Sequence, residues 1–316
     1  MIISKDVLII GGGPGGMYSS IIGALINVSS FIVESNDNLG GQPMQLYAEK
    51  DIYDYPGFLT IQPYVLTEGM KEQIKSYPDK IEVSLKTTIL DIVKDGDYFL
   101  TKLSNDEIVK TRFIIIATGS GSFTPVKSDL LKEVNYSNIH YVFQGEKQYK
   151  NKKIVILGGG DSALDWANYL NEKNITNDVV LVHRREEFRA RQEKVNKLSL
   201  NNTRTYLNFN LSKISKNNIV INGIESKEEV TIPYEFLLVQ YGQEIKRLGD
   251  IDILKQIERN RINKINIDIN CKTNVENIYA IGNSNDFEAK PNLIICAAAE
   301  GARAIYSIRK KIRETF

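Results

Sequence analysis

Short apolar runs along the chain end in glycine-rich turns. Residues 7–10 are all aliphatic, and the six residues that follow, 11–16, contain five glycines. A helix-like stretch from about 17 to 27 comes next, and the apolar residues 31–33 follow it. A strand, a glycine turn, a helix and a second strand in this order predict a βαβ unit.

The same pattern recurs in the middle of the chain. The run 153–157 leads into three glycines at 158–160, a helix-like stretch through about 171 and the apolar strand 179–182. The sequence therefore predicts two βαβ units of the nucleotide-binding type.

Two further apolar runs indicate how the chain is divided. Residues 113–116 end in Ala117-Thr118-Gly119, and residues 278–281 end in Gly282-Asn283 before an apolar helix from about 293 to 311. A length of 316 residues favours two compact units. We therefore expect an α/β protein of two Rossmann-like domains, the second inserted in the first, with boundaries at 1–118, 119–243 and 244–316.

The first glycine group has the spacing of a dinucleotide-binding turn. Gly11 would allow a tight turn, Gly13 would let a pyrophosphate approach the backbone, and Gly16 would let the helix pack closely on the strand. Pro14 and Gly15 complete the turn at the helix N-terminus, where phosphate binds favourably. Glu34, at the end of the next strand, can accept hydrogen bonds from both ribose hydroxyls of FAD or NAD. A purely structural glycine turn is the alternative.

The second unit differs at the position that selects the cofactor. His183, Arg184, Arg185 and Arg189 stand where Glu34 has its counterpart, and Arg191 follows. Guanidinium groups bind a 2′-phosphate through charge-assisted hydrogen bonds, and a carboxylate would repel it. This unit is therefore expected to bind NADPH through that cluster and through Gly158, Gly160, Asp161, Ser162 and Ala163. A solvated basic surface is the alternative interpretation.

A flavin in one unit and a nicotinamide in the other would suit hydride transfer. The two fingerprints, Ala117-Thr118-Gly119, Gly282-Asn283 and the His-Arg-Arg sequence together resemble the low-molecular-weight thioredoxin reductase superfamily over essentially the whole chain. Within it, the chain is most similar to the thioredoxin-reductase-like ferredoxin/flavodoxin–NADP reductases. This likeness lies in three stretches, 46–54, 139–141 and 158–167.

One motif of thioredoxin reductases is missing. They carry a CxxC just before the second fingerprint, whereas the matching stretch here, 141–146, has no cysteine, and the chain's two cysteines are Cys271 and Cys296. Without a dithiol beside the flavin, electrons must leave the flavin directly, which suits ferredoxin or flavodoxin as the acceptor. Reduction of a flavin, a quinone or a partner disulfide protein stays open, as does a non-catalytic nucleotide sensor or scaffold.

The resemblance also implies roles for single residues. Gln42, after Gly41, would hydrogen-bond the flavin's pyrimidine edge, and Tyr47 would stack on the isoalloxazine ring. Ile89 would meet the adenine through its backbone, and Phe123 would lie near the flavin. A buried core tyrosine is the alternative for Tyr47. Ala117, Thr118, Gly119, Gly282 and Asn283 complete the expected FAD site.

This sequence departs from the family's pattern in three places, one of which is the start of the last helix at 297–301. Asn283 replaces an aspartate whose carboxylate bonds the ribityl chain; its amide oxygen can still accept a hydrogen bond. The sequence also stops at Phe316, soon after the last helix, whereas ferredoxin-type members usually carry a further flavin-covering segment. We therefore expect FAD to bind more weakly and one flavin face to be open, which leaves the electron acceptor undecided.

Composition and charge narrow the partners. A formal net charge of +1 provides no global field for nucleic acid or an anionic membrane, and no apolar run approaches the roughly 20 residues of a membrane span. Residues 1–6 lack the features of a signal peptide, which favours the cytoplasm. We expect no metal site and no general acid or base, with His140 structural. The resemblance implies a homodimer.

Overall fold

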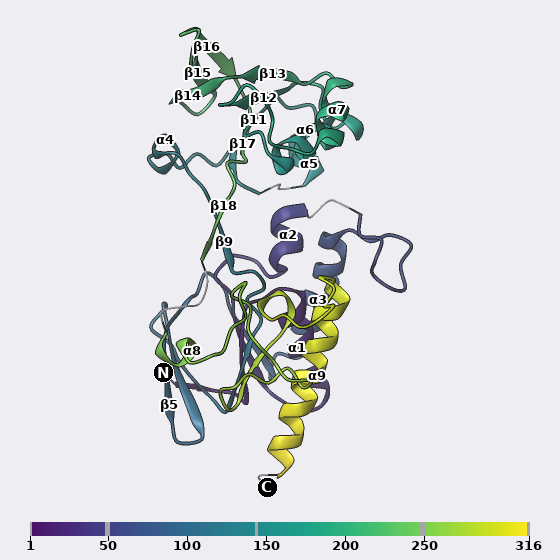
Figure 1. Cartoon of the computed structure of the whole chain (residues 1–316), viewed down its shortest axis with the longest axis vertical. Coiled ribbons are helices and arrows are strands. Elements are labelled where there is room, and N and C mark those ends of the chain that lie inside the picture. The colour runs from purple at the N-terminus through teal and green to yellow at the C-terminus, as the bar shows by residue number, and fades with distance from the viewer. Residues whose placement is uncertain (1, 48–50, 143–144, 247–250, 315–316) are drawn as a thin grey trace. The chain divides into compact units, whose positions relative to one another are not determined.

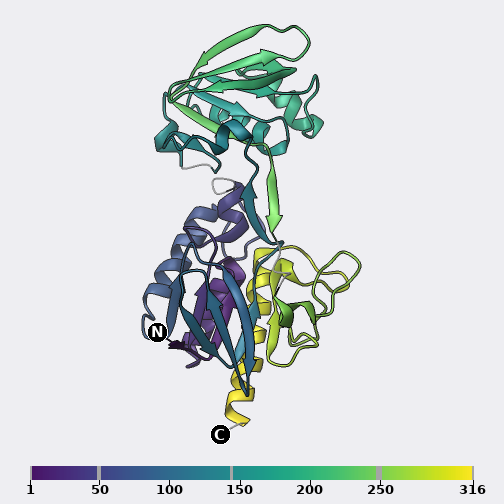
Figure 2. The same cartoon turned by 90° about the vertical axis from the view of Figure 1, so that its left-hand side faces the viewer.

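The computed structural model describes residues 2–47, 51–142, 145–246 and 251–314. The chain forms two compact units. One comprises Met1–Ser122 with Ile245–Phe316, and the other comprises Phe123–Glu244. Figures 1 and 2 show that each unit has its own sheets and helices.

The first unit is built on a five-stranded parallel sheet in the order β19-β8-β2-β3-β4. The strands β2, β3 and β8 are buried along their whole length, as expected for a parallel sheet covered on both faces. The five strands are β2 (Val7–Ile10), β3 (Ser30–Val33), β4 (Ile81–Ser84), β8 (Phe113–Ile116) and β19 (Ile278–Ala280).

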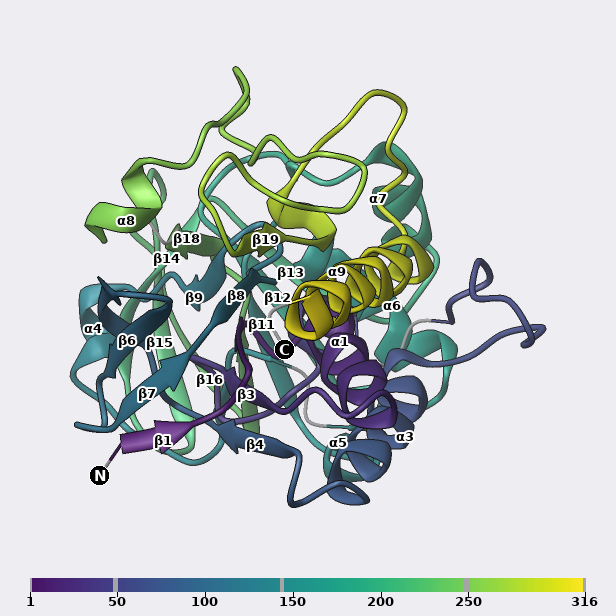
Figure 3. The same ribbon diagram turned by 90° about the horizontal axis from the view of Figure 1, so that it is seen from below.

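Alternate residues of β2 face two different cores. Val7 and Ile9 pack with residues of α1 (Pro14–Leu25), α3 (Pro63–Lys75) and α9 (Ile294–Glu314), whereas Leu8 and Ile10 pack with a second sheet. Figure 3 shows α1 and α9 side by side on one face of the parallel sheet. The second sheet, in the order β1-β7-β6-β5, consists of β1 (Ile2–Ser4), β5 (Ile89–Asp95), β6 (Tyr98–Leu103) and β7 (Ile108–Thr111).

The second unit repeats the first unit's plan. Its five-stranded parallel sheet has the order β10-β17-β11-β12-β13. Apolar side chains of α6 (Asp161–Glu172) and α7 (Gln192–Ser199) pack on one face, and a three-stranded antiparallel sheet packs on the other. The strands are β10 (Ile139–His140), β11 (Ile154–Leu157), β12 (Val179–His183), β13 (Arg204–Leu207), β14 (Phe209–Ile214), β15 (Asn218–Gly223), β16 (Glu229–Pro233) and β17 (Phe236–Val239).

The chain passes between the units twice, at two strands that pair with each other. These are β9 (Ser122–Pro125) and β18 (Gln243–Lys246). The remaining short elements are α2 (Gly41–Tyr47), α4 (Asp129–Lys132), α5 (Glu146–Tyr149), α8 (Asp252–Lys255) and the 3₁₀ turn η1 (Gly282–Ser284). Among the described helices, none is long and apolar enough to cross a bilayer.

The fold class expected from the sequence is confirmed: both units are Rossmann-like, and the second is inserted in the first. The boundaries of single elements differ by a few residues. The first helix begins at Pro14 because proline suits the first helical position, where its missing N–H costs no hydrogen bond. The strand expected at 179–182 extends by one residue, to His183, which is consequently buried.

Candidate functional site

The first glycine turn joins β2 to α1 as the fingerprint requires. Gly11 has φ +110°, and a Cβ there would lie 2.5 Å from the carbonyl oxygen of Ala117. A Cβ on Gly16 would lie 2.1 Å from the carbonyl oxygen of Gly11. Both positions therefore require glycine to fold. Pro14 and Gly15 are buried in the first turn of α1.

Gly13 is different because neither conformation nor packing demands glycine there. It is the N-cap of α1 with φ −72° and ψ 178°, and a Cβ would meet only the Cα of Gly41, at an ordinary 3.7 Å. The turn thus leaves space above the helix N-terminus. That space and the positive end of the helix dipole together can accept an anion.

Glu34 lies directly beside this turn. It is only 5% exposed, and its Oε2 accepts a hydrogen bond from the backbone N–H of Gly12 at 2.8 Å. Its Oε1 accepts from the backbone N–H of Asn36 at 2.9 Å and from Asn36 Nδ2 at 2.7 Å, with Ser35 Oγ at 3.2 Å. A carboxylate offers about four lone-pair sites, and one on Oε2 stays open here. A second ribose hydroxyl would bond Oε1 in place of the Asn36 or Ser35 side chain.

The ends of β8 and β19 bring the other expected residues of this unit to the same sheet edge. Ala117 N donates to the Ile10 carbonyl at 2.8 Å, which places the Ala117-Thr118-Gly119 turn next to the glycine turn. Thr118 and Gly119 line a cleft together with Lys264 and Ser284. Because the carboxyl ends of parallel strands form the usual ligand-binding edge, these residues belong to one candidate site.

Asn283 and Gln42 meet at this edge, although 241 positions separate them. Asn283 Nδ2 donates to Gln42 Oε1 at 3.3 Å, and the Lys264 ammonium donates to the Asn283 carbonyl. Gln42 and Gly41 lie in α2, and a Cβ on Gly41, which has φ +59°, would come 2.7 Å from Gly13 Cα.

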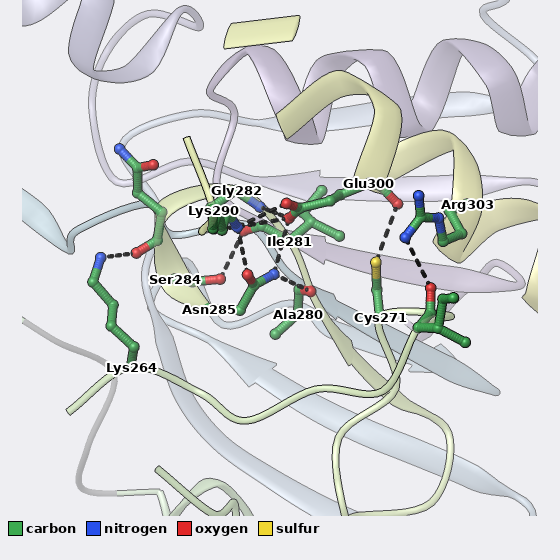
Figure 4. Close-up of polar contacts among 12 residues, drawn as sticks. Lys264, Cys271, Ala280, Ile281, Gly282, Ser284, Asn285, Lys290, Glu300 and Arg303 are labelled. Carbon is green, nitrogen blue, oxygen red and sulfur yellow. Dashed lines mark hydrogen bonds and ion pairs between the residues drawn. The ribbon is translucent and has the colours of Figure 1, made fainter. Parts of the chain in front are cut away.

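A buried ion pair that the sequence analysis missed supports the Gly282-Asn283 turn (Figure 4). Lys290 and Glu300 have side chains only 2% and 5% exposed, and Lys290 Nζ lies 2.8 Å from Glu300 Oε1. Glu300 Oε2 accepts from the Gly282 N–H at 2.7 Å, and Lys290 donates to the Gly282 carbonyl at 2.7 Å. One signal was available: Glu300 directly follows the apolar run 294–299, and a charge in such a place is seldom buried unless paired.

In the second unit, the turn between β11 and α6 closely resembles the first turn. Gly158 has φ +143°, and a Cβ there would lie 2.3 Å from the Gln240 carbonyl oxygen. Gly160 is the N-cap of α6 with extended backbone, and a Cβ on it would find open space. Ala163, at the third fingerprint position, is fully buried. This unit therefore also has an open space above a helix N-terminus.

Asp161 and Ser162 form the first turn of α6. Asp161 Oδ1 accepts the backbone N–H of Arg191 at 2.9 Å, and Lys194 Nζ lies 3.7 Å away. These contacts, chiefly the one from the Arg191 backbone, lower the pKa of Asp161. The carboxylate therefore stays ionised, and the nearby Arg191 and Lys194 side chains partly offset its charge beside the candidate phosphate position. Ser162 is exposed at the same place.

The arginines expected to choose the cofactor lie at the end of β12. Arg184, Arg185 and Arg189 are exposed, and Arg189 N donates to the Gly159 carbonyl at 2.7 Å. Within the described ranges, their guanidinium groups form no hydrogen bond or ion pair. The hydrogen bond from Arg189 N to the Gly159 carbonyl holds Arg189 beside the glycine turn. The arginine side chains can therefore bind an anionic ligand at that turn.

His183 does not share the exposure of those arginines. It is 7% exposed, and its ring fills the space beside Gly159, where a Cβ would lie 2.3 Å from it. Burial first of all, and then the charges of Arg185, Arg184 and Arg189, lower the pKa of His183. The imidazole is therefore neutral at physiological pH and contributes no cation to the cluster.

The remaining expected residues are placed in part. Tyr47 ends α2 and Phe123 lies in β9, but their side chains lie outside what the structure describes. Ile89 begins β5, two residues after Thr87, whose N–H donates to the Glu34 carbonyl at 3.0 Å. His140 is buried and bonded to Tyr149 Oη at 2.6 Å, and burial lowers its pKa. Among the described residues, no cluster of three or more potential metal ligands occurs.

The chain is similar to known proteins over nearly its whole length. Residues 5–301 match the family model described as pyridine nucleotide-disulphide oxidoreductase. The chain belongs to this family. A ferredoxin–NADP reductase of Malacoplasma penetrans is 40% identical over 317 residues, covering 98% of this chain and 97% of the relative. One of Streptococcus sanguinis is 36% identical over 307 residues, covering 95% and 92%.

Solved structures of two thioredoxin reductases share the fold. The thioredoxin reductase of T. acidophilum matches with a TM-score of 0.66 at 18% identity over 98% of each chain. The thioredoxin reductase of Lactococcus lactis matches with a TM-score of 0.64 at 23% identity, covering 98% of this chain and 99% of the other. At these identities the likeness concerns the fold, and thus supports the two-unit Rossmann architecture.

Proposed function

We propose that the protein is a flavoenzyme that binds FAD in its first unit and NADPH in its second, and that it transfers electrons between NADPH and a ferredoxin or flavodoxin. The observation that carries the proposal is the opposite charge at two equivalent strand ends. β3 ends beside the carboxylate of Glu34, and β12 ends beside Arg184 and Arg185. The acidic strand end suits the free ribose hydroxyls of FAD, and the basic strand end suits the 2′-phosphate of NADPH.

Each turn fits a dinucleotide pyrophosphate. Gly13 and Gly160 have ordinary extended backbones and room for a Cβ, so the protein's own packing does not require glycine at either position. A pyrophosphate that approaches the backbone closely would require it. The N–H groups at the starts of α1 and α6 would then donate to the phosphate oxygens.

The residues of the first unit have distinct tasks toward FAD. Glu34 holds the adenosine ribose, and the backbone at Ile89 borders the adenine. Gln42 and Asn283, already in contact, bond the polar edge and ribityl chain of the flavin. Tyr47 stacks on the ring, and Phe123 lies near it. The remaining backbone contacts come from Gly11, Gly15, Gly16, Gly41, Ala117, Thr118, Gly119 and Gly282.

The residues of the second unit orient NADPH. Arg184, Arg185 and Arg189 bind the 2′-phosphate. His183 is neutral and adds no charge; its ring packs against Gly159 in the glycine turn. Gly158, Asp161, Ser162 and Ala163 shape the turn that receives the pyrophosphate. The charge of this cluster selects NADPH over NADH.

The chemistry of transfer requires no acid, base or thiol from the protein. When bound, FAD accepts a hydride and releases single electrons, which matches a one-electron carrier. The chain's two cysteines are 25 positions apart in sequence, at Cys271 and Cys296, and burial raises the pKa of Cys271 to about 12. Cys271 therefore stays a thiol and cannot serve as the reactive thiolate of a dithiol relay. The relatives named ferredoxin–NADP reductase support the same acceptor class.

A carrier-dependence assay tests the proposal. The FAD-loaded protein is supplied with NADPH or NADH, and cytochrome c reduction is measured with and without ferredoxin or flavodoxin. We expect reduction that depends strongly on both NADPH and the carrier. Reduction of a disulfide protein instead, with no response to either carrier, would contradict the assignment of the acceptor. A protein that binds no flavin would contradict the flavoenzyme itself.

We also propose that the protein acts as a homodimer in the cytoplasm. The family resemblance supports the dimer. Light scattering of the FAD-loaded protein measures the mass directly. A mass equal to one 35.8 kDa chain across a wide concentration range would contradict the dimer.

A further inference from the structure

The buried pair Lys290–Glu300 forms hydrogen bonds to both the backbone N–H and the backbone carbonyl of Gly282. Gly282 donates its N–H to Glu300 Oε2 at 2.7 Å, and its carbonyl accepts from Lys290 Nζ at 2.7 Å (Figure 4). Gly282 has φ +63°, which makes it the bend that turns the chain from β19 toward Asn283. The pair therefore holds this bend from both sides.

Asn285 links the pair to the strand. Its Nδ2 donates to Glu300 Oε2 at 2.9 Å and to the Ala280 carbonyl at 2.7 Å, and its Oδ1 accepts from Lys290. Asn285 is 2% exposed. The network thus spans 280–285, with Asn283 as its outward residue that reaches Gln42.

The same helix also contacts the first glycine turn. A Cβ on Gly301 would come 3.0 Å from the Gly15 carbonyl, and a Cβ on Gly15 would come 3.2 Å from the Ala297 carbonyl. Glu300 therefore sits where α9 packs tightly on the N-terminal part of α1. The start of α9 therefore lies against the turn proposed for the pyrophosphate, and its Glu300 carboxylate bonds the turn proposed for the ribityl chain.

Burying two charges is costly unless their geometry is specific. An apolar pair of similar size would pack the same space, but it could not bond the N–H and carbonyl of Gly282. We propose that Lys290 and Glu300 are positioning residues for the flavin: they hold the Gly282-Asn283 turn in the conformation that binds FAD. This inference rests on the proposed flavin site and assigns it two residues outside any fingerprint.

The test separates positioning from ordinary stability. Three variants are compared: Lys290→Met, Glu300→Gln, and Lys290→Met combined with Glu300→Leu. For each apoprotein we measure the FAD dissociation constant by fluorescence titration, the visible absorption spectrum of bound flavin, and the melting temperature. Lys255→Met is the matched control because Lys255 forms an exposed pair with Asp252 at 2.8 Å in the same unit.

We expect each single variant to bind FAD about 10- to 100-fold more weakly, as for the loss of charge-assisted hydrogen bonds. Each single variant should also melt at a lower temperature, since it leaves one buried charge without a partner. The double variant should recover part of this loss because neither charge remains. Its FAD affinity should stay low, and the spectrum of its bound flavin should shift toward that of free FAD. Lys255→Met should match the wild type.

Two results would overturn the inference, and they differ in meaning. If the double variant binds FAD with the wild-type dissociation constant and spectrum, the pair only stabilises the fold, and the flavin site stands without it. If the wild-type protein itself binds no FAD while still folding cooperatively, the proposed function fails and the inference fails with it.

Discussion

Asn283 and Gln42 contact each other across the carboxyl edge of the first unit's sheet, with Asn283 Nδ2 3.3 Å from Gln42 Oε1. One residue follows β19 and the other lies in α2, near opposite ends of the sequence. Both side chains are neutral amides, so each can turn away from the other and hydrogen-bond a ligand without leaving a buried charge behind. This contact marks where the flavin's polar edge is expected, and it leads to the first prediction.

Replacing Asn283 by aspartate should raise FAD affinity severalfold. A carboxylate accepts a ribityl hydroxyl through a charge-assisted hydrogen bond that is roughly twice as strong as a neutral one. The Gln42 amide would turn to present its Nε2 to the new carboxylate. Fluorescence titration of the apoprotein checks this, with Asn283→Ala expected to bind FAD about threefold to tenfold more weakly. An aspartate variant that binds more weakly than the wild type would show that Asn283 is adapted to another role.

Removing the arginines should abolish the preference for NADPH. Arg184→Ala and Arg185→Ala should each raise the NADPH dissociation constant about 10- to 100-fold while leaving that of NADH nearly unchanged. Arg204→Ala is the matched control because Arg204 is exposed in the same unit but pairs with Asp178 at 2.7 Å. Equal losses for NADPH and NADH would mean that the cluster does not contact the 2′-phosphate.

Two neighbouring glycines should respond differently to alanine. In Gly159→Ala the new methyl group would collide with the His183 ring, which should destabilise the fold by about 1–3 kcal/mol. Gly160→Ala has open space and should cost less than about 1 kcal/mol as an N-cap change. If NADPH binds as proposed, its pyrophosphate needs the space at Gly160, so this variant should fold well but bind NADPH poorly. Denaturant unfolding and NADPH titration measure the two effects, and full NADPH affinity in Gly160→Ala would contradict the placement of the pyrophosphate.

Acidification should weaken the fold through its two histidines. Burial lowers the pKa of both His140 and His183 below the usual value of about 6.5. Between the lowered and the usual pKa, the unfolded chain binds more protons than the folded protein, so the free energy of unfolding rises with pH in that window. Stability should therefore be complete above about pH 6.5 and fall as the pH drops below it. In a His140→Gln, His183→Gln variant, this slope should disappear; an unchanged slope would assign it to other groups.

A chain without cysteine should keep its electron-transfer activity. In Cys271→Ala combined with Cys296→Ser, NADPH-driven reduction of ferredoxin should proceed at nearly the wild-type rate because no thiol relay takes part. Some stability should be lost, since Cys271 is fully buried. The reduction rate per bound FAD is the appropriate measure. Loss of that rate in a folded, FAD-loaded variant would indicate a thiol intermediate.

The sequence predicted the features that follow from local rules. Gly11, Gly16 and Gly158 need unusual backbone conformations or close approach, and such needs are visible as residue types at fixed spacing. The position of Glu34 beside the first turn also follows from the βαβ pattern. Its hydrogen bond to Gly12 agrees with that placement.

Other features depend on residues that fold together from distant segments. The Lys290–Glu300 pair has no spacing rule, because a loop and the start of α9 must first bring the two charges together. In the sequence, His183 belongs to a basic cluster. In the structure it is the last, buried residue of β12, and burial lowers its pKa so that the ring is neutral. Burial decided both cases, and burial depends on the whole unit rather than on the neighbouring residues.

The central claim is that NADPH reduces a bound flavin, which then passes electrons directly to a one-electron carrier. Anaerobic rapid-mixing spectroscopy on the FAD-loaded protein tests this in two steps. NADPH should bleach the flavin much faster than NADH does, and ferredoxin or flavodoxin should then restore its colour as the carrier becomes reduced. A flavin that NADPH bleaches but neither carrier reoxidises, while a disulfide substrate does, would contradict the account.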